Sequence, residues 1–275
     1  MTTTLPTTAI LGAGSMGGAI LAGLLAPDVT VLGGIRVTNR TEQKAVLLRS
    51  ETVTSSATES TPGANLSAVE GAGIVLVAVK PAMVPDLLRE IAPALEESTL
   101  VVSVAAGVTI ATMESLVGAV ALRAMPNTPS SVRRGVTGIS AGSRASDDDV
   151  EQVSALFGTV GEVLVVPESR IDALSTISGS GPAYVFYLIE ELTRAATALG
   201  FTDAQARLMV EHTFLGASEL LLASNETPAE LRRRVTSPKG TTEQAVGVLE
   251  SAGLAELFGR ATAAALARAG ELAAG

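Results

Sequence analysis

The pattern of hydrophobic and polar positions divides the chain into a part with short strands and a part with long helices. Up to about residue 166, brief apolar runs rich in β-branched residues recur between helical stretches, at 9–11, 36–38, 74–79, 100–104, 120–123, 137–140 and 163–166. The runs at 74–79 and 100–102 lack alternating polar positions, which is typical of central strands covered on both faces. This alternation of strands and helices predicts βαβ units and a mostly parallel sheet.

Beyond Pro167 the strand pattern stops, and helices are expected at 183–200, 203–224, 228–235, 242–251 and 254–273. Thr227-Pro228-Ala229-Glu230 combines an N-cap, a proline at the first helical position and a capping glutamate. In the first part, Asp147 to Asp149 are expected to supply an N-cap and first-turn charges for a helix through Phe157. The sequence therefore predicts an α/β domain over residues 1–166 and an all-α domain over residues 167–275.

The first long helix of the second part is apolar on every side from Pro182 to Ile189. A helix without a polar face has to be buried all round. Because a domain of about 110 residues gives limited cover, we expect a second subunit to supply some of it.

Composition removes several kinds of chemistry. The chain has no Cys and one His, His212, which excludes thiolate catalysis, disulfides, zinc ribbons and His-rich metal sites, so no metal is expected. A formal net charge of −9 and only seven aromatic residues argue against nucleic-acid binding. Most of the chemistry of an enzyme with this composition has to come from a cofactor.

Residues 1–27 carry no charge, and 9–26 approaches the hydropathy of a membrane span. We expect neither a span nor a signal peptide, because no basic residues precede the stretch and glycines interrupt it. A buried strand followed by a buried helix has the same hydropathy. The cytoplasm is the expected location, although the absence of Cys does not establish it.

Those glycines form Gly12-Ala13-Gly14-Ser15-Met16-Gly17, directly after the first expected strand and at the start of the first helix. In this motif Gly12 permits a tight turn, Gly14 lets the backbone approach a pyrophosphate, and Gly17 allows close packing of helix on strand. The N-terminus of the helix supplies N–H groups and a positive dipole for phosphates. The alternative is a merely tight turn between strand and helix.

The end of the second strand decides between two nucleotides. NAD-specific folds carry an Asp or Glu there for the ribose diol, whereas this chain has Asn39 and Arg40. A guanidinium can bind a 2′-phosphate through two parallel N–H bonds. The sequence therefore favours NADP(H) over NAD(H), with an ordinary exposed Arg40 as the alternative.

Further residues follow the next strands, at the edge of the sheet where ligands bind. Lys80 and Pro81 directly follow the apolar run at 74–79. Lys80 can be interpreted equally well as a ligand-binding residue or as an ordinary solvated residue at a strand end. Ser103 to Gly107 are small enough to form a wall beside a flat ring. The prolines of Arg123 to Pro129 favour a structured turn.

Two glycine–serine segments precede helices in the second part, 178–182 and 236–243. Each offers hydroxyls, amides and a helix N-terminus that suit a carboxylate. Two well-capped helices would be the simpler interpretation of either segment alone, but their occurrence beside a dinucleotide motif favours a substrate site.

With these motifs in order, the chain resembles the pyrroline-5-carboxylate reductase family over essentially its whole length. The resemblance rests on six segments: 10–17, 79–81, 103–107, 123–129, 178–184 and 235–242. It implies a Rossmann-like N-terminal domain, an all-α dimerisation domain, and dimers that often assemble into decamers. It also implies the reduction of 1-pyrroline-5-carboxylate to L-proline, the last step of proline biosynthesis, with NADPH, or NADH, as the cofactor.

Carried over residue by residue, the resemblance assigns contacts with the cofactor to Leu11, Gly12, Ala13, Gly14, Ser15, Met16, Asn39, Arg40, Asn65, Val79, Lys80, Pro81, Val104, Ala105 and Ala106. It assigns the substrate carboxylate to Ser237, Gly240 and Thr241, and a further ligand contact to Glu168. The catalytic residue would be Thr242, whose hydroxyl would hydrogen-bond the ring nitrogen.

Two residues depart from the family pattern. Lys239 stands where the family usually has the first Gly of a pair, which puts a positive φ there in doubt. His212 replaces a usual Gln in a helix and is interpreted as structural.

Two other functions remain open at this point. A 3-hydroxyacid dehydrogenase of the 6-phosphogluconate dehydrogenase group is disfavoured, because no Lys follows 179–181 until Lys239. An NADPH-binding regulator without activity is supported only by the Lys239 departure.

Overall fold

The computed structural model describes residues 2–274. The chain forms two compact units. The sheet unit runs to Ser180 and includes the chain again from Leu266, and the helical unit is Gly181–Ala265. The division into domains between residues 166 and 167 stays a prediction.

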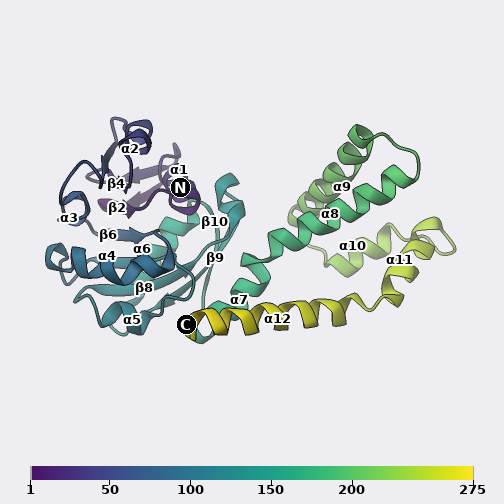
Figure 1. Cartoon of the computed structure of the whole chain (residues 1–275). Coiled ribbons are helices and arrows are strands. Elements are labelled where there is room, and N and C mark those ends of the chain that lie inside the picture. Colours follow the sequence, from purple (N-terminus) through teal and green to yellow (C-terminus); the bar gives the residue numbers. More distant parts are fainter. Residues whose placement is uncertain (1, 275) are drawn as a thin grey trace. The chain divides into compact units, whose positions relative to one another are not determined.

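An eight-stranded sheet forms the centre of the sheet unit (Figure 1). Its strands are β2 (Thr8–Leu11), β4 (Ile35–Asn39), β5 (Val53–Ala57), β6 (Ile74–Val77), β7 (Leu100–Ser103), β8 (Val120–Met125), β9 (Gly135–Ala141) and β10 (Gly161–Val165). All seven strands expected from the apolar runs are present. The eighth, β5, has the polar sequence Val-Thr-Ser-Ser-Ala and gave no apolar run. A separate pair of short parallel strands, β1 (Thr3–Leu5) and β3 (Val29–Val31), was also not predicted.

The strand order places β2 at a reversal of the chain. The order is β10-β9-β8-β7-β6-β2-β4-β5, so the chain proceeds from β2 to one side through β4 and β5 and then to the other through β6. Only the pairing of β8 with β9 is antiparallel, which confirms the mostly parallel sheet. In such sheets the crevice for ligands lies beyond the carboxyl ends of the strands at the reversal.

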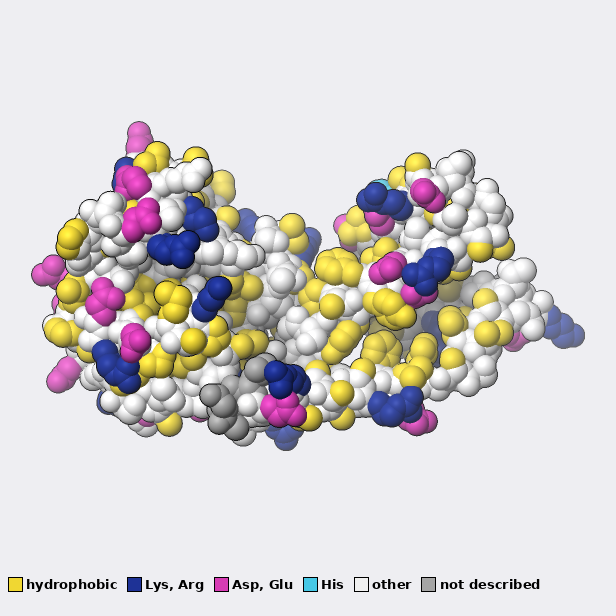
Figure 2. Space-filling model, viewed as in Figure 1, with side chains coloured by type: hydrophobic (Ala, Val, Ile, Leu, Met, Phe, Trp, Pro, Cys, Tyr) yellow, Lys and Arg dark blue, Asp and Glu magenta, His cyan; other side chains and the backbone are white. Residues whose placement is uncertain are grey.

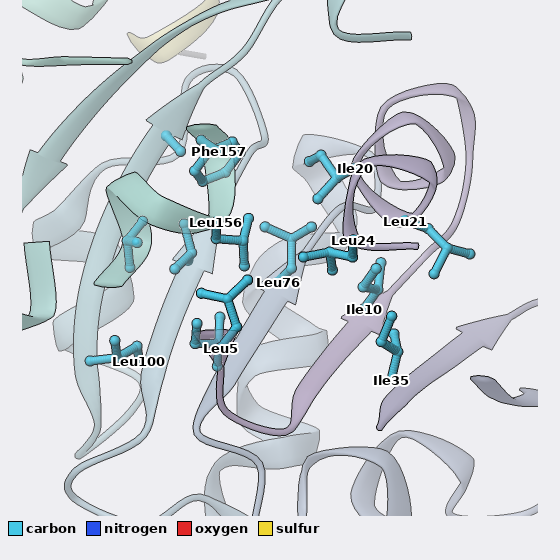
Figure 3. Packing of buried hydrophobic residues seen from close by; sticks show 14 of the residues in the cluster. Leu5, Ile10, Ile20, Leu21, Leu24, Ile35, Leu76, Leu100, Leu156 and Phe157 are labelled. Carbon is cyan, nitrogen blue, oxygen red and sulfur yellow. The ribbon is translucent and has the colours of Figure 1, made fainter. Parts of the chain in front are cut away.

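Alternate side chains of the buried strands face two hydrophobic clusters. Ile10 of β2 packs in the cluster with α1 (Ser15–Leu24) and α6 (Asp147–Gly158). Figure 3 shows Leu and Ile side chains of α1 and the strands pointing toward one another in this cluster. Leu11 lies in the other cluster, which includes residues of α3 (Ala64–Val69), α4 (Val84–Ile91) and α5 (Ile110–Glu114). The strands are therefore covered on both faces, as their uninterrupted apolar runs predicted.

The cap of α6 differs by one residue from the prediction. Ser146, and not an aspartate, is the N-cap, and its hydroxyl accepts from the Asp149 amide. The Asp149 carboxylate in turn accepts from the Ser146 amide at 2.8 Å. The three aspartates occupy the first turn, where their charge suits the helix dipole.

The segment between β10 and the helical unit is helical almost throughout. We call Glu168–Gly179 the lead-in; it consists of a 3₁₀ turn (Glu168–Arg170), α7 (Ile171–Leu174) and a π-helical turn (Ser175–Gly179). The prediction of a free helix N-terminus at 178–182 is wrong. The Ser180 amide instead donates to the Ser175 carbonyl at 2.9 Å, so the π turn continues to the start of the next helix.

The helical unit confirms the helices predicted from the second part of the chain. They are α8 (Gly181–Ala198), α9 (Asp203–Ala223), α10 (Pro228–Arg234), α11 (Thr241–Ser251) and α12 (Leu254–Ala274), whose end belongs to the sheet unit. Thr227 caps α10 as predicted, accepting from the Glu230 amide.

The helical unit buries very little of its own apolar surface. Within 181–265, only Ala206 and Val210 are buried hydrophobic residues, and α8 has no buried residue. Phe186 is 65% exposed and Leu222 is 75% exposed. Figure 2 shows hydrophobic side chains gathered at the surface of these helices. No helix in the described part of the chain has the length and hydropathy needed to cross a membrane.

Candidate active site

The glycine-rich turn after β2 has the backbone that the motif predicted. Gly12 has a φ of +95°, and a Cβ there would lie 2.9 Å from Val79 Cγ1. A Cβ on Gly17 would lie 2.3 Å from the Gly12 carbonyl oxygen. No atom comes within 4 Å of a Cβ built on Gly14. The first and third glycines therefore permit close packing, whereas the second leaves space beside the backbone.

The N-terminus of α1 suits an anion. Its N-cap is Gly14, which has no side chain to cap the first amides, and its first turn contains no acidic residue. Because the first amides of a helix lack intrahelical acceptors, Ser15 and Met16 present N–H groups and the positive end of the dipole. Gly14 and Ser15 are exposed.

A cavity of about 900 Å³ lies at the carboxyl ends of β2, β4 and β6. Seven residues assigned to the cofactor line it: Leu11, Gly12, Asn39, Arg40, Asn65, Val79 and Lys80. They come from four separate parts of the sequence, and the fold brings them together at the reversal of strand order. The other assigned residues do not line this cavity: Ala13, Gly14, Ser15, Met16, Pro81, Val104, Ala105 and Ala106.

The residues outside the cavity lining have defined places nearby in the fold. Ala13 to Met16 continue the glycine-rich turn into α1, and Pro81 begins a 3₁₀ turn (Pro81–Met83) after Lys80. Val104 to Ala106 follow β7, the neighbour of β6, and the Val104 amide donates to the Val77 carbonyl at 3.1 Å. They therefore follow neighbouring strands of the same sheet.

The cavity contains a buried donor that has no partner. Asn39 is 6% exposed, and its Nδ2 atom makes no hydrogen bond. A buried donor without an acceptor is costly unless a ligand satisfies it. The cations Arg40, Lys44 and Lys80 also line the cavity, with the carboxylates of Asp86 and Glu90. The open Gly14, the orphaned Asn39 amide and these cations fit a phosphorylated dinucleotide.

Ten of the residues that line the cavity were not assigned from the sequence, and Lys44 and Thr58 are two polar examples. Lys44 lies in the first turn of α2 (Glu42–Leu48), the helix that begins two residues after Arg40. Thr58 follows β5, the strand whose polar sequence gave no signal. Asn65 was assigned, and its Nδ2 donates to both carboxylate oxygens of Glu90 at 3.1 Å.

The substrate residues lie in the turn before α11, within the helical unit. The Gly240 amide donates to the Ser237 carbonyl at 2.9 Å, and a Cβ on Gly240 would lie 2.9 Å from that same oxygen. Gly240 is the N-cap of α11 and contributes no side-chain cap. Thr241 and Thr242 are the first two residues of the helix and are exposed, so their amides and hydroxyls can reach a ligand.

Lys239 adopts the conformation that its departure from the pattern put in doubt. Its φ is +59°, in the left-handed region where glycine is ordinarily found. The Glu243 carboxylate accepts from the Lys239 amide at 2.7 Å, which holds the turn closed. The backbone of the turn therefore has a positive φ although a lysine occupies the position.

Glu168 lies in the lead-in and not in the turn with the other substrate residues. Its Oε1 atom accepts from the Ile110 amide at 2.8 Å and pairs with Arg123 Nη1 at 3.5 Å. Its side chain is 31% exposed, so the residue is partly accessible. His212 is exposed on α9. Among residues 2–274 no cluster of three or more His, Asp or Glu side chains could hold a metal ion.

Comparison with family models divides the chain in a similar way. The model described as pyrroline-5-carboxylate reductase dimerisation matches residues 168–272. The model described as NADP oxidoreductase, coenzyme F420-dependent, matches residues 7–107.

Individual proteins are similar along nearly the whole chain. A pyrroline-5-carboxylate reductase of Corynebacterium melassecola is 38% identical, over 97% of this chain and 98% of its own. The structure of a pyrroline-5-carboxylate reductase from Coxiella burnetii is 39% identical, with a TM-score of 0.88 over 96% of this chain and 97% of that one. A Plasmodium falciparum pyrroline carboxylate reductase with NADP bound is 25% identical, with a TM-score of 0.79 over 96% of both chains.

Proposed function

Because the chain belongs to the pyrroline-5-carboxylate reductase family, we propose that it reduces 1-pyrroline-5-carboxylate to L-proline with NADPH as the preferred cofactor. The observation that carries the preference is the cavity at the reversal of strand order, where Arg40 stands beside the orphaned Asn39 amide and no carboxylate follows β4 directly. A guanidinium favours a 2′-phosphate that a carboxylate would repel.

The cofactor is proposed to lie in the cavity of the sheet unit. The amides of Gly14 to Met16 would bind the pyrophosphate, Asn39 and Arg40 the adenosine end, and Asn65 a further part of the nucleotide. Residues 79–81 and 104–106 would form the surroundings of the nicotinamide. When bound, NADPH supplies the hydride.

The substrate carboxylate is proposed to bind at the N-terminus of α11. The amides of Gly240 and Thr241 and the hydroxyl of Ser237 are the donors, and the helix dipole adds a favourable field. Glu168, whose side chain is partly exposed, is proposed as a further ligand contact.

Thr242 is the proposed catalytic residue. Its hydroxyl would hydrogen-bond the ring nitrogen. Protonation of that nitrogen makes the neighbouring imine carbon a strong hydride acceptor, and the nitrogen becomes the amine of proline. Reduction of a protonated C=N bond consumes one hydride and leaves a neutral amine, so it does not require a strong general base. Positioning of the imine is then the main contribution of the protein to the rate.

The two rival functions have less support. No lysine follows 179–181 within α8, so the catalytic Lys of the 3-hydroxyacid dehydrogenase group is missing. The left-handed conformation of Lys239 removes the main reason to propose an inactive regulator, because the turn keeps its positive φ.

The chain is proposed to act as a homodimer. The match to a dimerisation domain and the exposed apolar side chains of α8 and α9 support this assembly. A decamer of five such dimers and action in the cytoplasm stay predictions, and light scattering of the purified protein measures the number of subunits.

A spectrophotometric assay tests the proposed reaction. The purified chain is mixed with racemic pyrroline-5-carboxylate, and the oxidation of NADPH and of NADH is followed in parallel. We expect turnover with both, with a higher kcat/KM for NADPH. NADPH binding without any turnover would support the regulator, and turnover of 3-hydroxyacids alone would support the dehydrogenase.

A further inference from the structure

Two segments singled out in the sequence lie together in the fold, and the proposed reaction uses neither directly. Asn127 belongs to the segment after β8, and Ser178 belongs to the π turn of the lead-in. Asn127 Nδ2 donates to the Ser178 carbonyl at 2.9 Å, and Asn127 Oδ1 accepts from the Val136 amide at 2.8 Å. Asn127 is only 7% exposed. Its amide therefore joins the lead-in to the start of β9.

A second joint lies four residues earlier on β8. Arg123 is 4% exposed, and its guanidinium donates to Asp172 Oδ1 at 2.7 Å and to Glu168 Oε1 at 3.5 Å. Both carboxylates belong to the lead-in. Because a buried charge is stable only when it is paired, these contacts fix the lead-in to the sheet strongly. Glu168 also accepts from the Ile110 amide, which adds a third element to the joint.

The lead-in is where the chain leaves the sheet unit. Its π turn ends at Gly179, and the helical unit begins at Gly181 with α8. A π turn is rarer than an α-helical turn and occurs often at functional sites. The carbonyl of Ser178 accepts from Asn127, a residue 51 positions away in the sequence. The geometry of the turn is therefore held from the sheet.

We propose that Arg123 and Asn127 are positioning residues for the reduction of the imine. The inference rests on the proposed function, in which the cofactor residues belong to the sheet unit and Thr242 to the helical unit. By holding the lead-in at both ends, these two residues fix the point from which α8 starts. Neither residue lines the cofactor cavity. Loss of a joint therefore lowers kcat and leaves NADPH binding unchanged, because a small misplacement of reacting groups slows the chemical step steeply.

Asn127→Asp is the sharpest variant. It keeps an oxygen that accepts from the Val136 amide, and it replaces the donor with a second oxygen that faces the Ser178 carbonyl. We expect kcat with pyrroline-5-carboxylate to fall by about 10-fold or more, and the Kd for NADPH from fluorescence titration to stay within about twofold. Amide hydrogen exchange in 175–181 becomes faster. Asn225→Asp, the same change at an exposed residue before α10, is the matched control.

The pH profile separates positioning from general loss of stability. When protonated, the carboxyl introduced by Asn127→Asp donates to the Ser178 carbonyl and restores the lost bond. Burial beside a carbonyl oxygen raises the pKa of that carboxyl. The ratio of variant to wild-type kcat is therefore expected to rise as pH is lowered from about 8 to about 5.5.

Asp172→Asn tests the second joint independently. It keeps an acceptor for the Arg123 guanidinium and removes one of its two carboxylates, so kcat falls while NADPH binding persists. If Asn127→Asp does not fold, Asp172→Asn still tests whether the contacts between the sheet and the lead-in position the reacting groups. Wild-type kcat and unchanged hydrogen exchange in a folded Asn127→Asp would overturn the inference, as would equal losses of kcat and NADPH affinity. A wild-type protein that does not reduce the imine overturns the proposed function instead, and the exchange measurement still tests the joint.

Discussion

The two units of this chain differ in how far they bury their apolar side chains. In the sheet unit, all four residues of β2, of β6 and of β7 are buried, and two clusters cover the two faces of the sheet. In the helical unit, α8 buries nothing, and the 21 residues of α9 bury two. Both hydrophobic clusters of the described residues therefore lie in the sheet unit. The difference indicates that the sheet unit is complete within one chain, whereas the helical unit needs a further surface to cover it.

The largest effect on assembly and activity is expected from a charge placed on the exposed apolar surface of α8. Phe186→Asp places a charge on the apolar surface of α8, and an unpaired charge in an interface costs about 3–5 kcal/mol. We expect the dimer to dissociate at micromolar concentration and activity to fall by about 100-fold or more. Sedimentation and the NADPH assay measure both.

Leu47→Asp is the control for that comparison. Leu47 is 78% exposed on α2 in the sheet unit and does not line the cofactor cavity. This variant should keep the assembly and the activity of the wild type. A Phe186→Asp protein that remains a fully active dimer would contradict the need for cover.

The helical unit also carries the proposed catalytic hydroxyl, so the chemistry can be separated from binding. Thr242→Ala removes the hydroxyl that hydrogen-bonds the reacting nitrogen, and the loss of one such preorganised hydrogen bond lowers kcat by about 100-fold. NADPH titration should be unchanged, because the cavity residues all belong to the sheet unit. Thr242→Ser, which keeps the hydroxyl, should recover most of the rate. Turnover of Thr242→Ala near the wild-type value would remove Thr242 from the mechanism.

A substitution in the cofactor cavity of the sheet unit should weaken NADPH binding more than it lowers kcat. Arg40→Ala removes a charged donor to the 2′-phosphate, so the Kd for NADPH should rise by about 10-fold or more. NADH, which lacks that phosphate, should bind as before. An unchanged NADPH affinity in a calorimetric titration would show that Arg40 is an ordinary surface cation.

The smallest effect concerns a surface contact of the sheet unit. Hydrogen bonds from the Ser143 hydroxyl and amide lower the pKa of Glu114 below its ordinary value of 4.5. A lowered pKa stabilises the folded state above pH 4.5, and this stabilisation is lost as pH falls through the pKa of the folded state.

Ser143→Ala keeps the amide bond to Glu114 and removes only the hydroxyl bond. It should therefore lower the free energy of unfolding by about 0.5 kcal/mol at neutral pH, and the difference should shrink in acid. Denaturant titrations at neutral pH and below pH 4.5 measure the two values. A difference that does not depend on pH would assign the effect to lost packing.

The sequence predicted the fold well because its strongest signals are local. The apolar run at 74–79 is typical of a buried strand and contains β6, and the glycines of 12–17 need a specific backbone. β5 was missed because its residues are polar, and Thr58 was missed with it. The conformation of Lys239 depends on an acceptor four residues away, Glu243, which the pattern of glycines did not include.

Other features of the site depend on residues distant in sequence. The π turn reads as a glycine–serine loop in the sequence, and its partner Asn127 is 51 positions earlier. The pairing of Arg123 with Glu168 and Asp172 likewise joins β8 to a segment more than 40 residues later. Three-dimensional contacts of this kind have no local signature.

The π turn also sets the rotational phase of everything after it. A π turn holds one residue more than an α-helical turn, and each residue of an α-helix turns the chain by about 100°. If the five residues Ser175–Gly179 formed regular α-helical turns with none of them deleted, the extra residue would rotate the faces of α8 by about that angle. The π conformation of this short segment thus keeps the residues of α8 in phase with the helical residues before it, although none of its own residues needs to touch whatever α8 packs against.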